Sequence, residues 1–232
     1  AHRNGEEYYV RGTFTRYNLD FTTDVEDMLD HGFPAVSMEP VVGEDTESYS
    51  IKEEDLPRVK EEYDRLAQLF IRREEEGRPF FFFHFNMDLW KGPCLPKRLR
   101  GCGAGHEYLA VVPNGDIYPC HQFVGREGYV LGNVYEGLKN MKMMHDFRTN
   151  HVFTKPECVD CWAKFFCSGG CHANNEAFAG DIHKPYHITC EIQKKRVECA
   201  MMIQAYNQLK KPRVMAQPGS FEAKREAQEK LQ

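Results

Sequence analysis

Eight of the nine cysteines in the chain follow a spacing that is typical of metal binding. Four lie in one short run, Cys158-x2-Cys161-x5-Cys167-x3-Cys171. The other four are Cys94, Cys102, Cys120 and Cys190. Thiolates at such close spacing converge when they bind a common group, and four of them hold one tetrahedral Zn²⁺ or one iron–sulfur cluster. The pattern therefore predicts two metal centres of four thiolates each.

The composition narrows the choice of protein class. A disulfide framework is disfavoured because nine is an odd number and because 232 residues exceed the size of the small secreted domains that depend on disulfides. The net charge of −5 and the lack of a long basic run argue against a nucleic-acid surface. No apolar stretch reaches membrane-spanning length, and the polar start of the chain has no signal-peptide pattern. We therefore expect a cytoplasmic protein that binds neither nucleic acid nor membranes.

The first part of the chain alternates between strand and helix patterns. Residues 8–14 and 33–42 are typical of buried strands, and 56–70 carry apolar residues at alternating spacings of three and four, which predicts a helix. A capping-box pattern at 23–26 predicts the start of a shorter helix. This order indicates βα units around a parallel sheet or barrel. Two such units cannot close a barrel, which needs about 200 residues or more.

After Cys94 the sequence changes to short strands, loops and cysteines. Residues 108–112 and 116–120 flank Asn114-Gly115, and this dipeptide favours a tight hairpin turn. The further elements expected are a strand over 130–134, a helix over 139–149 and a closing helix over 192–209.

Several motifs of this second part together resemble the SPASM domain, the C-terminal extension of radical S-adenosylmethionine (SAM) enzymes that modify peptides and proteins. They are Cys102-Gly-Ala-Gly, Asn114-Gly-Asp-Ile-Tyr-Pro-Cys120, Leu131-Gly-Asn-Val134, the run from Cys158 to Cys171, and Cys190. The implied fold class is α/β, with the last strands and helices of a partial (β/α)6 barrel in residues 1–90. A small α+β cysteine-rich SPASM domain would follow at 91–192, and a closing helix with a polar tail at 193–232.

The resemblance also implies the cofactors and their ligands. SPASM domains carry two auxiliary [4Fe–4S] clusters with interleaved ligands. The first cluster would be held by Cys102, Cys120 and Cys171, with Cys94 as the fourth ligand or, alternatively, with one iron open to a substrate thiolate. The second cluster would be held by Cys158, Cys161, Cys167 and Cys190. The ninth cysteine, Cys199, is expected to be a buried free thiol, since cysteine packs well as a small apolar residue.

The Cys-x3-Cys-x2-Cys motif that holds the SAM-cleaving cluster of this family does not occur in the sequence. We therefore expect the C-terminal part of a longer enzyme, in which SAM and a third [4Fe–4S] cluster are bound, and no radical formation by this chain alone. Arg11 and Glu39 are candidates for SAM binding. Each has an alternative, because Arg11 could pair with a neighbouring acid and Glu39 with a neighbouring base.

Further strings are similar to maturases of six-cysteine (SCIFF) peptides, among them Arg11-Gly-Thr-Phe-Thr15 and Tyr118-Pro-Cys-His-Gln-Phe-Val-Gly125. Those enzymes join a cysteine sulfur to a carbon of another residue. A 5′-deoxyadenosyl radical removes hydrogen from the carbon, sulfur bonds to that carbon, and one electron leaves through an auxiliary cluster. The implied partners are a cysteine-rich precursor peptide and an electron donor such as ferredoxin or flavodoxin.

Two alternatives to the thioether hypothesis stay open. One is anaerobic sulfatase maturation, which forms formylglycine; those enzymes typically place an aspartate base after the hairpin cysteine, where this chain has His121. His121 is accordingly a candidate catalytic base, or a residue that hydrogen-bonds a cluster. The other alternative is a non-enzymatic zinc-binding module, although the single Cys-x2-Cys pair is less than a zinc ribbon requires.

Overall fold

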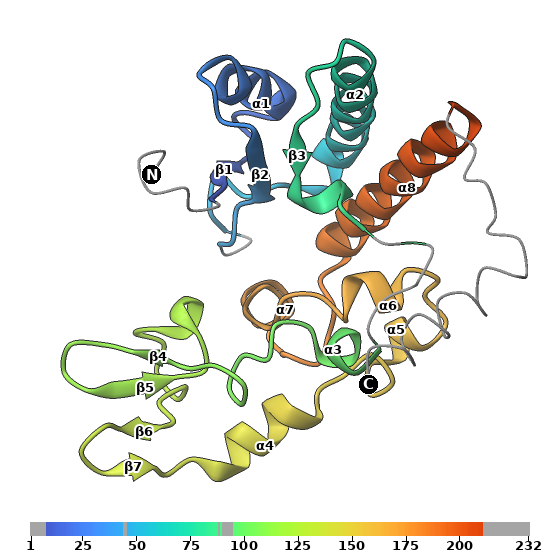
Figure 1. Ribbon diagram of the computed structural model, residues 1–232. Coiled ribbons are helices and arrows are strands. Elements are labelled where there is room, and N and C mark those ends of the chain that lie inside the picture. The colour runs from blue at the N-terminus through green and yellow to red at the C-terminus, as the bar shows by residue number, and fades with distance from the viewer. Residues whose placement is uncertain (1–7, 44–45, 88, 90–94, 211–232) are drawn as a thin grey trace, which may run out of the picture.

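The computed structural model describes residues 8–43, 46–87, 89 and 95–210 and shows a mixed α/β protein in two parts. In Figure 1, one part contains strands β1 to β3 with α1, α2 and α8, and the other contains strands β4 to β7 and helices α3 to α7.

The sheet of the first part consists of three parallel strands in the order β1-β2-β3. Strand β1 (Val10–Phe14) pairs with β2 (Ala35–Pro40), and β2 pairs with β3 (Phe81–Phe82). Helix α1 (Phe21–Asp30) connects β1 to β2, and α2 (Leu56–Glu75) connects β2 to β3. Two short 3-10 turns are also present: η1 (Glu53–Asp55) directly precedes α2, and η2 (Phe83–Phe85) directly follows β3. The predicted βα alternation is confirmed.

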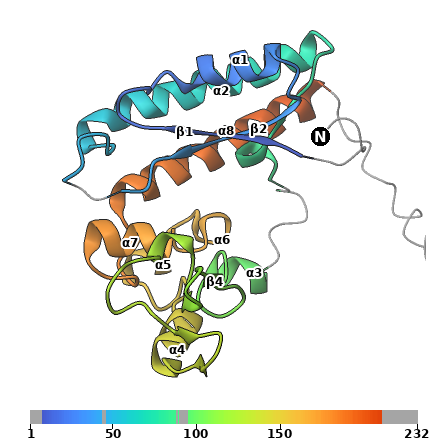
Figure 2. The same cartoon turned by 90° about the vertical axis from the view of Figure 1, so that its left-hand side faces the viewer.

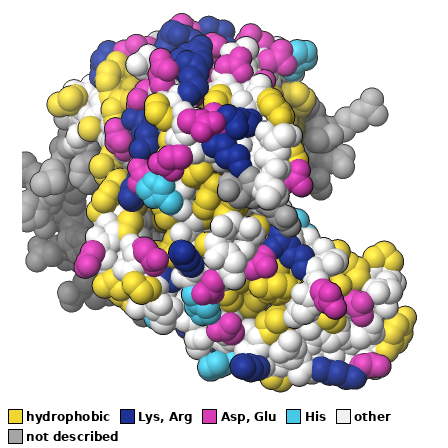
Figure 3. Space-filling view, turned by 180° about the vertical axis from the view of Figure 1, so that it is seen from behind, with side chains coloured by type: hydrophobic (Ala, Val, Ile, Leu, Met, Phe, Trp, Pro, Cys, Tyr) yellow, Lys and Arg dark blue, Asp and Glu magenta, His cyan; other side chains and the backbone are white. Residues whose placement is uncertain are grey.

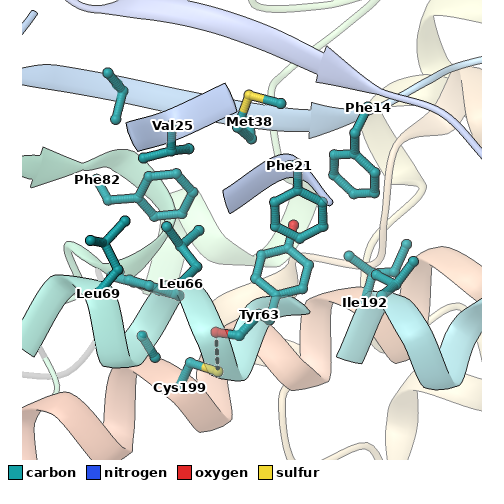
Figure 4. Close-up of a cluster of buried hydrophobic side chains, with 14 of the residues drawn as sticks. Phe14, Phe21, Val25, Met38, Tyr63, Leu66, Leu69, Phe82, Ile192 and Cys199 are labelled. Atoms are coloured by element: carbon teal, nitrogen blue, oxygen red, sulfur yellow. Dashed lines mark hydrogen bonds between the residues drawn. The ribbon is translucent and has the colours of Figure 1, made fainter. Parts of the chain in front are cut away.

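The core of this part lies between the sheet and the helices (Figure 4). Tyr63 of α2 is fully buried against the rings of Phe14 and Phe21. Cys199 of α8 is also buried and donates a hydrogen bond from Sγ to the carbonyl of Tyr63, at 3.6 Å. The expectation of a buried free thiol at Cys199 is thus confirmed.

The start of α1 differs from the sequence prediction. The capping box at 23–26 is not formed; the helix begins at Phe21 instead. The backbone N–H of Thr22 donates to Glu62 Oε1 on α2, at 3.0 Å, and the Thr22 hydroxyl donates to the Glu62 carbonyl. A carboxylate 40 positions away therefore satisfies an amide that a local cap usually binds.

The second part contains an antiparallel sheet of four short strands, β4-β5-β6-β7. They are β4 (Ala110–Val111), β5 (Asp116–Tyr118), β6 (Gly132–Asn133) and β7 (Gly137–Leu138). Hairpin β4-β5 confirms the Asn114-Gly115 prediction, with φ of +90° at Gly115. The helices and the 3-10 turn are α3 (Leu95–Arg100), η3 (His121–Phe123), α4 (Met141–Thr149), α5 (Pro156–Val159), α6 (Lys164–Cys167) and α7 (His172–Ala179). Phe123 and Phe147 form the centre of a second, smaller core.

Helix α8 (His187–Lys210) connects the two parts. It begins next to α7 and then runs along the helices of the first part (Figures 1 and 2). An ion pair of 2.7 Å joins Lys60 of α2 to Glu191 near its start. The helix begins five residues before its predicted start at 192, so Cys190 lies in its first turn. The domain limits expected from the sequence stay predictions, and the limit at 192 falls inside this helix.

The surface gives little further indication of partners. On the face seen in Figure 3, lysine and arginine side chains are interspersed with acidic ones. Of the helices in the described ranges, none has the length and apolar composition of a membrane span. The predictions concerning nucleic acid and cellular location stay predictions.

Candidate metal centres

Three cysteines of the predicted first cluster line one pocket of about 280 Å³. Cys102 lies in the turn after α3, Cys120 lies between β5 and η3, and Cys171 directly precedes α7. They are separated by up to 69 positions in the sequence, and the hairpin and the two helix starts bring them together. The structure thus places the three described ligand candidates of this cluster around one space.

Backbone N–H groups point at two of these sulfur atoms. Cys120 accepts hydrogen bonds from the N–H groups two and three residues ahead of it, and Cys171 does the same at the start of α7. Burial raises the pKa of both thiols, and these N–H groups lower it. The Tyr108 hydroxyl lies beside the thiols of Cys120 and Cys102 and can donate its one proton to either of them. Such donors stabilise thiolate, which is the form that binds metal.

The four cysteines of the predicted second cluster line another pocket, of about 320 Å³. Cys158 lies on α5, Cys161 follows that helix, Cys167 ends α6, and Cys190 lies in the first turn of α8. Burial, together with charge on the neighbouring cysteines, raises the pKa of Cys158 to about 11 and that of Cys190 to about 12. Because these thiols oppose one another's ionisation, the group favours a bound cation that compensates their charge.

The loop between the two groups is built to approach sulfur closely. Ser168, Gly169 and Gly170 all have positive φ, of 66°, 84° and 79°. The N–H groups of both glycines donate to the sulfur of Cys167. Successive N–H groups in this conformation form an anion-binding nest. A Cβ atom on Gly169 would lie 3.2 Å from Lys155 Nζ, so the position leaves little room for a side chain.

The two cysteines not yet described are Cys94 and Cys199. Cys94 lies outside the described residues. Cys199 lines neither pocket, and burial raises its pKa to about 12. Within the described ranges, no three His, Cys, Asp or Glu side chains are close enough to share one metal ion. Cys167 lines both pockets, which shows that the two spaces are neighbours.

The two candidates for SAM binding, Arg11 and Glu39, also line the 280 Å³ pocket. They lie on neighbouring strands, since Arg11 of β1 stands opposite Ser37 of β2 and Thr13 stands opposite Glu39. Arg11 is exposed and has no ion pair with any residue that the structure describes. One wall of the pocket is therefore formed by parallel strands and the other by cysteines.

Glu39 belongs to a buried network that the sequence did not reveal. Its Oε1 accepts a hydrogen bond from His84 Nε2 at 2.7 Å, and its Oε2 lies 3.4 Å from Arg196 Nη2. Arg196 Nε also donates to the Tyr63 hydroxyl at 2.8 Å, and its Nη2 to the carbonyl of Met38 at 3.1 Å. The ion pair that the sequence left as an alternative role for Glu39 is therefore present.

The charges in this network follow from its burial. Burial alone would raise the pKa of Glu39, but the His84 hydrogen bond and the Arg196 charge lower it to about 2. Burial and the charge of Arg196 lower the pKa of His84 to about 4. At neutral pH the carboxylate is ionised, the imidazole is neutral, and Arg196 supplies the compensating charge.

The candidate base, His121, begins η3 directly after Cys120 and is exposed at the pocket wall. A second histidine, His172, is 3% exposed and also lines the pocket. Asn150 Nδ2 lies 3.3 Å from His172 Nδ1 and 2.9 Å from the carbonyl of Ile182, which orients the imidazole. The sequence analysis missed His172, although it follows directly on Cys171.

Comparisons with known proteins agree with this arrangement. Residues 102–162 match the family model "SPASM: Iron-sulfur cluster-binding domain". The matched range includes Cys102, Cys120, Cys158 and Cys161. No curated protein sequence matches the chain.

Similar solved structures include hexahistidine-tagged anSMEcpe with bound AdoMet, with 16% identity and a TM-score of 0.64 over 88% of this chain and 56% of that one. Native anSMEcpe with bound AdoMet gives 16% identity and a TM-score of 0.61, over 88% and 58%. Its complex with AdoMet and the Kp18Cys peptide gives 16% and 0.57, over 88% and 59%. The chain thus spans a little over half the length of these structures. It shares their fold, and over residues 102–162 it is similar to the SPASM iron–sulfur cluster-binding domain.

Proposed function

We propose that this chain is the C-terminal part of a radical SAM enzyme that oxidises a peptide and carries two auxiliary [4Fe–4S] clusters. The observation that supports this most is the grouping of the cysteines around two adjoining pockets. The first pocket also contains Arg11 and Glu39 from the strands, so SAM-binding and cluster-binding residues would face one space. The SPASM match and the fold shared with an AdoMet-binding enzyme point the same way.

The donor atoms suit iron–sulfur clusters. Cys102, Cys120 and Cys171, with Cys94 as the fourth ligand, would hold the first cluster. Cys158, Cys161, Cys167 and Cys190 would hold the second. The groups supply sulfur ligands together with backbone N–H donors, and hydrogen bonds to sulfur are among the factors that set cluster potentials. When bound, such clusters accept and pass single electrons or bind a substrate thiolate.

The strand residues would bind SAM, which on reductive cleavage supplies the radical that removes hydrogen from a substrate carbon. Arg11 presents a guanidinium that no described acid occupies, and its planar fork suits the SAM carboxylate. Glu39 is held by His84 and Arg196, and the remaining lone pairs of its carboxylate can accept from a hydroxyl or ammonium group.

For the substrate we propose a cysteine-rich precursor peptide in which a thioether bond forms between sulfur and carbon. His121 stands beside Cys120 at the pocket wall, where a ring nitrogen can take the proton of a substrate thiol. A donor such as ferredoxin or flavodoxin would exchange electrons with the clusters.

Sulfatase maturation is supported equally by the fold. The similar structures are of anSME, a radical SAM sulfatase maturase, and one of them holds the Cp18Cys peptide. The residue that separates the two hypotheses is His121, which stands where the resemblance to sulfatase maturases places an aspartate.

The test uses the full-length enzyme of which this chain is a part, reconstituted without oxygen and supplied with SAM, a reductant and each peptide type. Thioether formation predicts loss of two hydrogens from a cysteine-rich peptide and a cysteine that no longer reacts with alkylating reagent. Formylglycine in a sulfatase-type peptide would overturn the thioether proposal. Cleavage of SAM without change in either peptide would contradict the proposed peptide oxidation.

A further inference from the structure

Lys155 is completely buried, which is rare for a lysine. It lies directly before Pro156 at the start of α5. Its Nζ donates one hydrogen bond, to the carbonyl of Gly169 at 2.7 Å. Among the residues that the structure describes, no carboxylate forms an ion pair with it. An ammonium in such a place requires a compensating negative charge, because burying an unpaired cation is very costly.

When a cluster is bound, the cysteines ligate as thiolates, so negative charge near Lys155 would come from cysteines of both groups. Cys158, Cys167 and Cys190 of the second group and Cys171 of the first each favour the charged ammonium, although burial lowers the pKa of Lys155. Its hydrogen-bond acceptor, Gly169, lies in the loop that leads from the second group to the first. Lys155 therefore lies where the two cysteine groups adjoin.

The hydrogen bond of Lys155 also acts on the geometry of this loop. The Gly169 carbonyl accepts from Lys155 Nζ and from Asn175 Nδ2, at 2.7 and 3.3 Å. With this carbonyl held from one side, the N–H groups of Gly169 and Gly170 point at the sulfur of Cys167. Lys155 thus combines a buried charge with the positioning of two N–H donors.

We propose that Lys155 is a shared counter-cation of the two auxiliary clusters and that its charge makes their reduction easier, more so for the second cluster. This inference rests on the proposed function, since it requires that the clusters are bound. A four-thiolate cluster gains negative charge on one-electron reduction, and cluster potentials depend on net charge, hydrogen bonding and solvent exposure. A cation in a low-dielectric interior acts more strongly than one at the surface. Gly169, whose carbonyl accepts the Lys155 hydrogen bond, lines the second pocket and not the first, hence the larger effect there.

The test compares three variants of the full chain. Lys155→Gln removes the charge and keeps a donor for the Gly169 carbonyl, whereas Lys155→Arg keeps the charge. Lys164→Gln is the matched control, because Lys164 lines the second pocket but is partly exposed and bonds the carbonyl of Val159. Each protein is reconstituted without oxygen, its iron and sulfide are counted, and its clusters are titrated with dithionite while the reduced signals are followed by electron paramagnetic resonance.

We expect full iron content in Lys155→Gln. The equilibrium constant for reduction of its second cluster should fall at least tenfold, which lowers the reduction potential by about 59 mV for one electron. The Lys155→Arg variant should restore most of this shift, and Lys164→Gln should change the potential far less. Unchanged potentials in a fully loaded Lys155→Gln protein would overturn the charge role. If Lys155→Gln loses iron, retention of iron by Lys155→Arg supports the charge role and loss by both overturns it. A wild-type chain that binds no cluster would instead refute the proposed function, and with it the role of Lys155.

Discussion

Replacing Arg196 by methionine should destabilise the first part of the chain strongly. Arg196 is 5% exposed, and its guanidinium contacts the Glu39 carboxylate, the Tyr63 hydroxyl and the carbonyl of Met38. Methionine fills much of the same volume but leaves the half-buried Glu39 carboxylate without its cation, and the Tyr63 hydroxyl and Met38 carbonyl with one partner fewer. Breaking a buried pair in this way costs about 3–5 kcal/mol.

The matched control is Arg72→Met, because the side chain of Arg72 is 57% exposed and pairs with the partly exposed Glu26. Exposed pairs contribute about 0–1 kcal/mol. The two variants and the wild type would be prepared without metal and unfolded in urea at pH 7, with circular dichroism as the signal. A loss below about 1 kcal/mol for Arg196→Met, similar to the control, would refute the importance of the network.

The pH dependence gives an independent test of the same reasoning. The folded pKa of Glu39, about 2, lies below its ordinary value of 4.5, so its ionisation stabilises the fold above pH 4.5 and this contribution is lost as the pH falls towards 2. In the wild type the charge of Arg196 lowers the pKa of both Glu39 and His84. Both pKa values therefore rise when Arg196 is replaced. The variant therefore takes up protons at higher pH than the wild type. The difference in free energy of unfolding should shrink between pH 6 and pH 3, and a constant difference would contradict the assignment of charges.

Three further predictions concern the cysteine groups. Cys190→Ala should lose about four irons and Cys199→Ala none, because Cys190 lines the second pocket and Cys199 does not. Equal iron contents in the two variants would show that the ligand assignment is wrong. Gly170→Ala should cost about 1–2 kcal/mol for its left-handed backbone and more for a Cβ atom 3.2 Å from Asn175 Oδ1, whereas Gly180→Ala, with nothing within 4 Å, should cost only the backbone part. Urea unfolding measures both, and a larger loss at Gly180 would count against the close fit of the loop. Cys94→Ala should open one iron of the first cluster so that added thiol changes its spectrum; a wild-type cluster that already binds thiol would argue against ligation by Cys94.

The elements that could be predicted from the sequence are those with local signals. The apolar periodicity of α2 and the Asn114-Gly115 turn each reflect forces between residues close in the chain, and both are confirmed. The predicted start of α1 was wrong because the amide of Thr22 binds Glu62, a distant residue that no local pattern identifies. The predicted start of α8 was five residues late, since the helix begins at His187 and already buries Ile188 in its first turn.

The candidate site divides in the same way. Cysteine spacing predicted two metal centres, since few other structures require such spacing. The resemblance to SPASM domains divided the cysteines into the two groups that line the two pockets. Lys155 and Arg196 could not be predicted, because both residue types are mostly exposed and their burial depends on contacts made only in the folded chain. One signal was available in retrospect, because Arg196 and Cys199 lie three positions apart on a helix whose buried face carries both.

The central claim is that this chain binds two [4Fe–4S] clusters, and iron and sulfide analysis after anaerobic reconstitution tests it most directly. The cysteine groups predict about eight irons and eight sulfides per chain. Four or fewer of each would contradict the two-cluster assignment. A colourless protein that contains two zinc ions when purified without oxygen would favour a zinc-binding module instead.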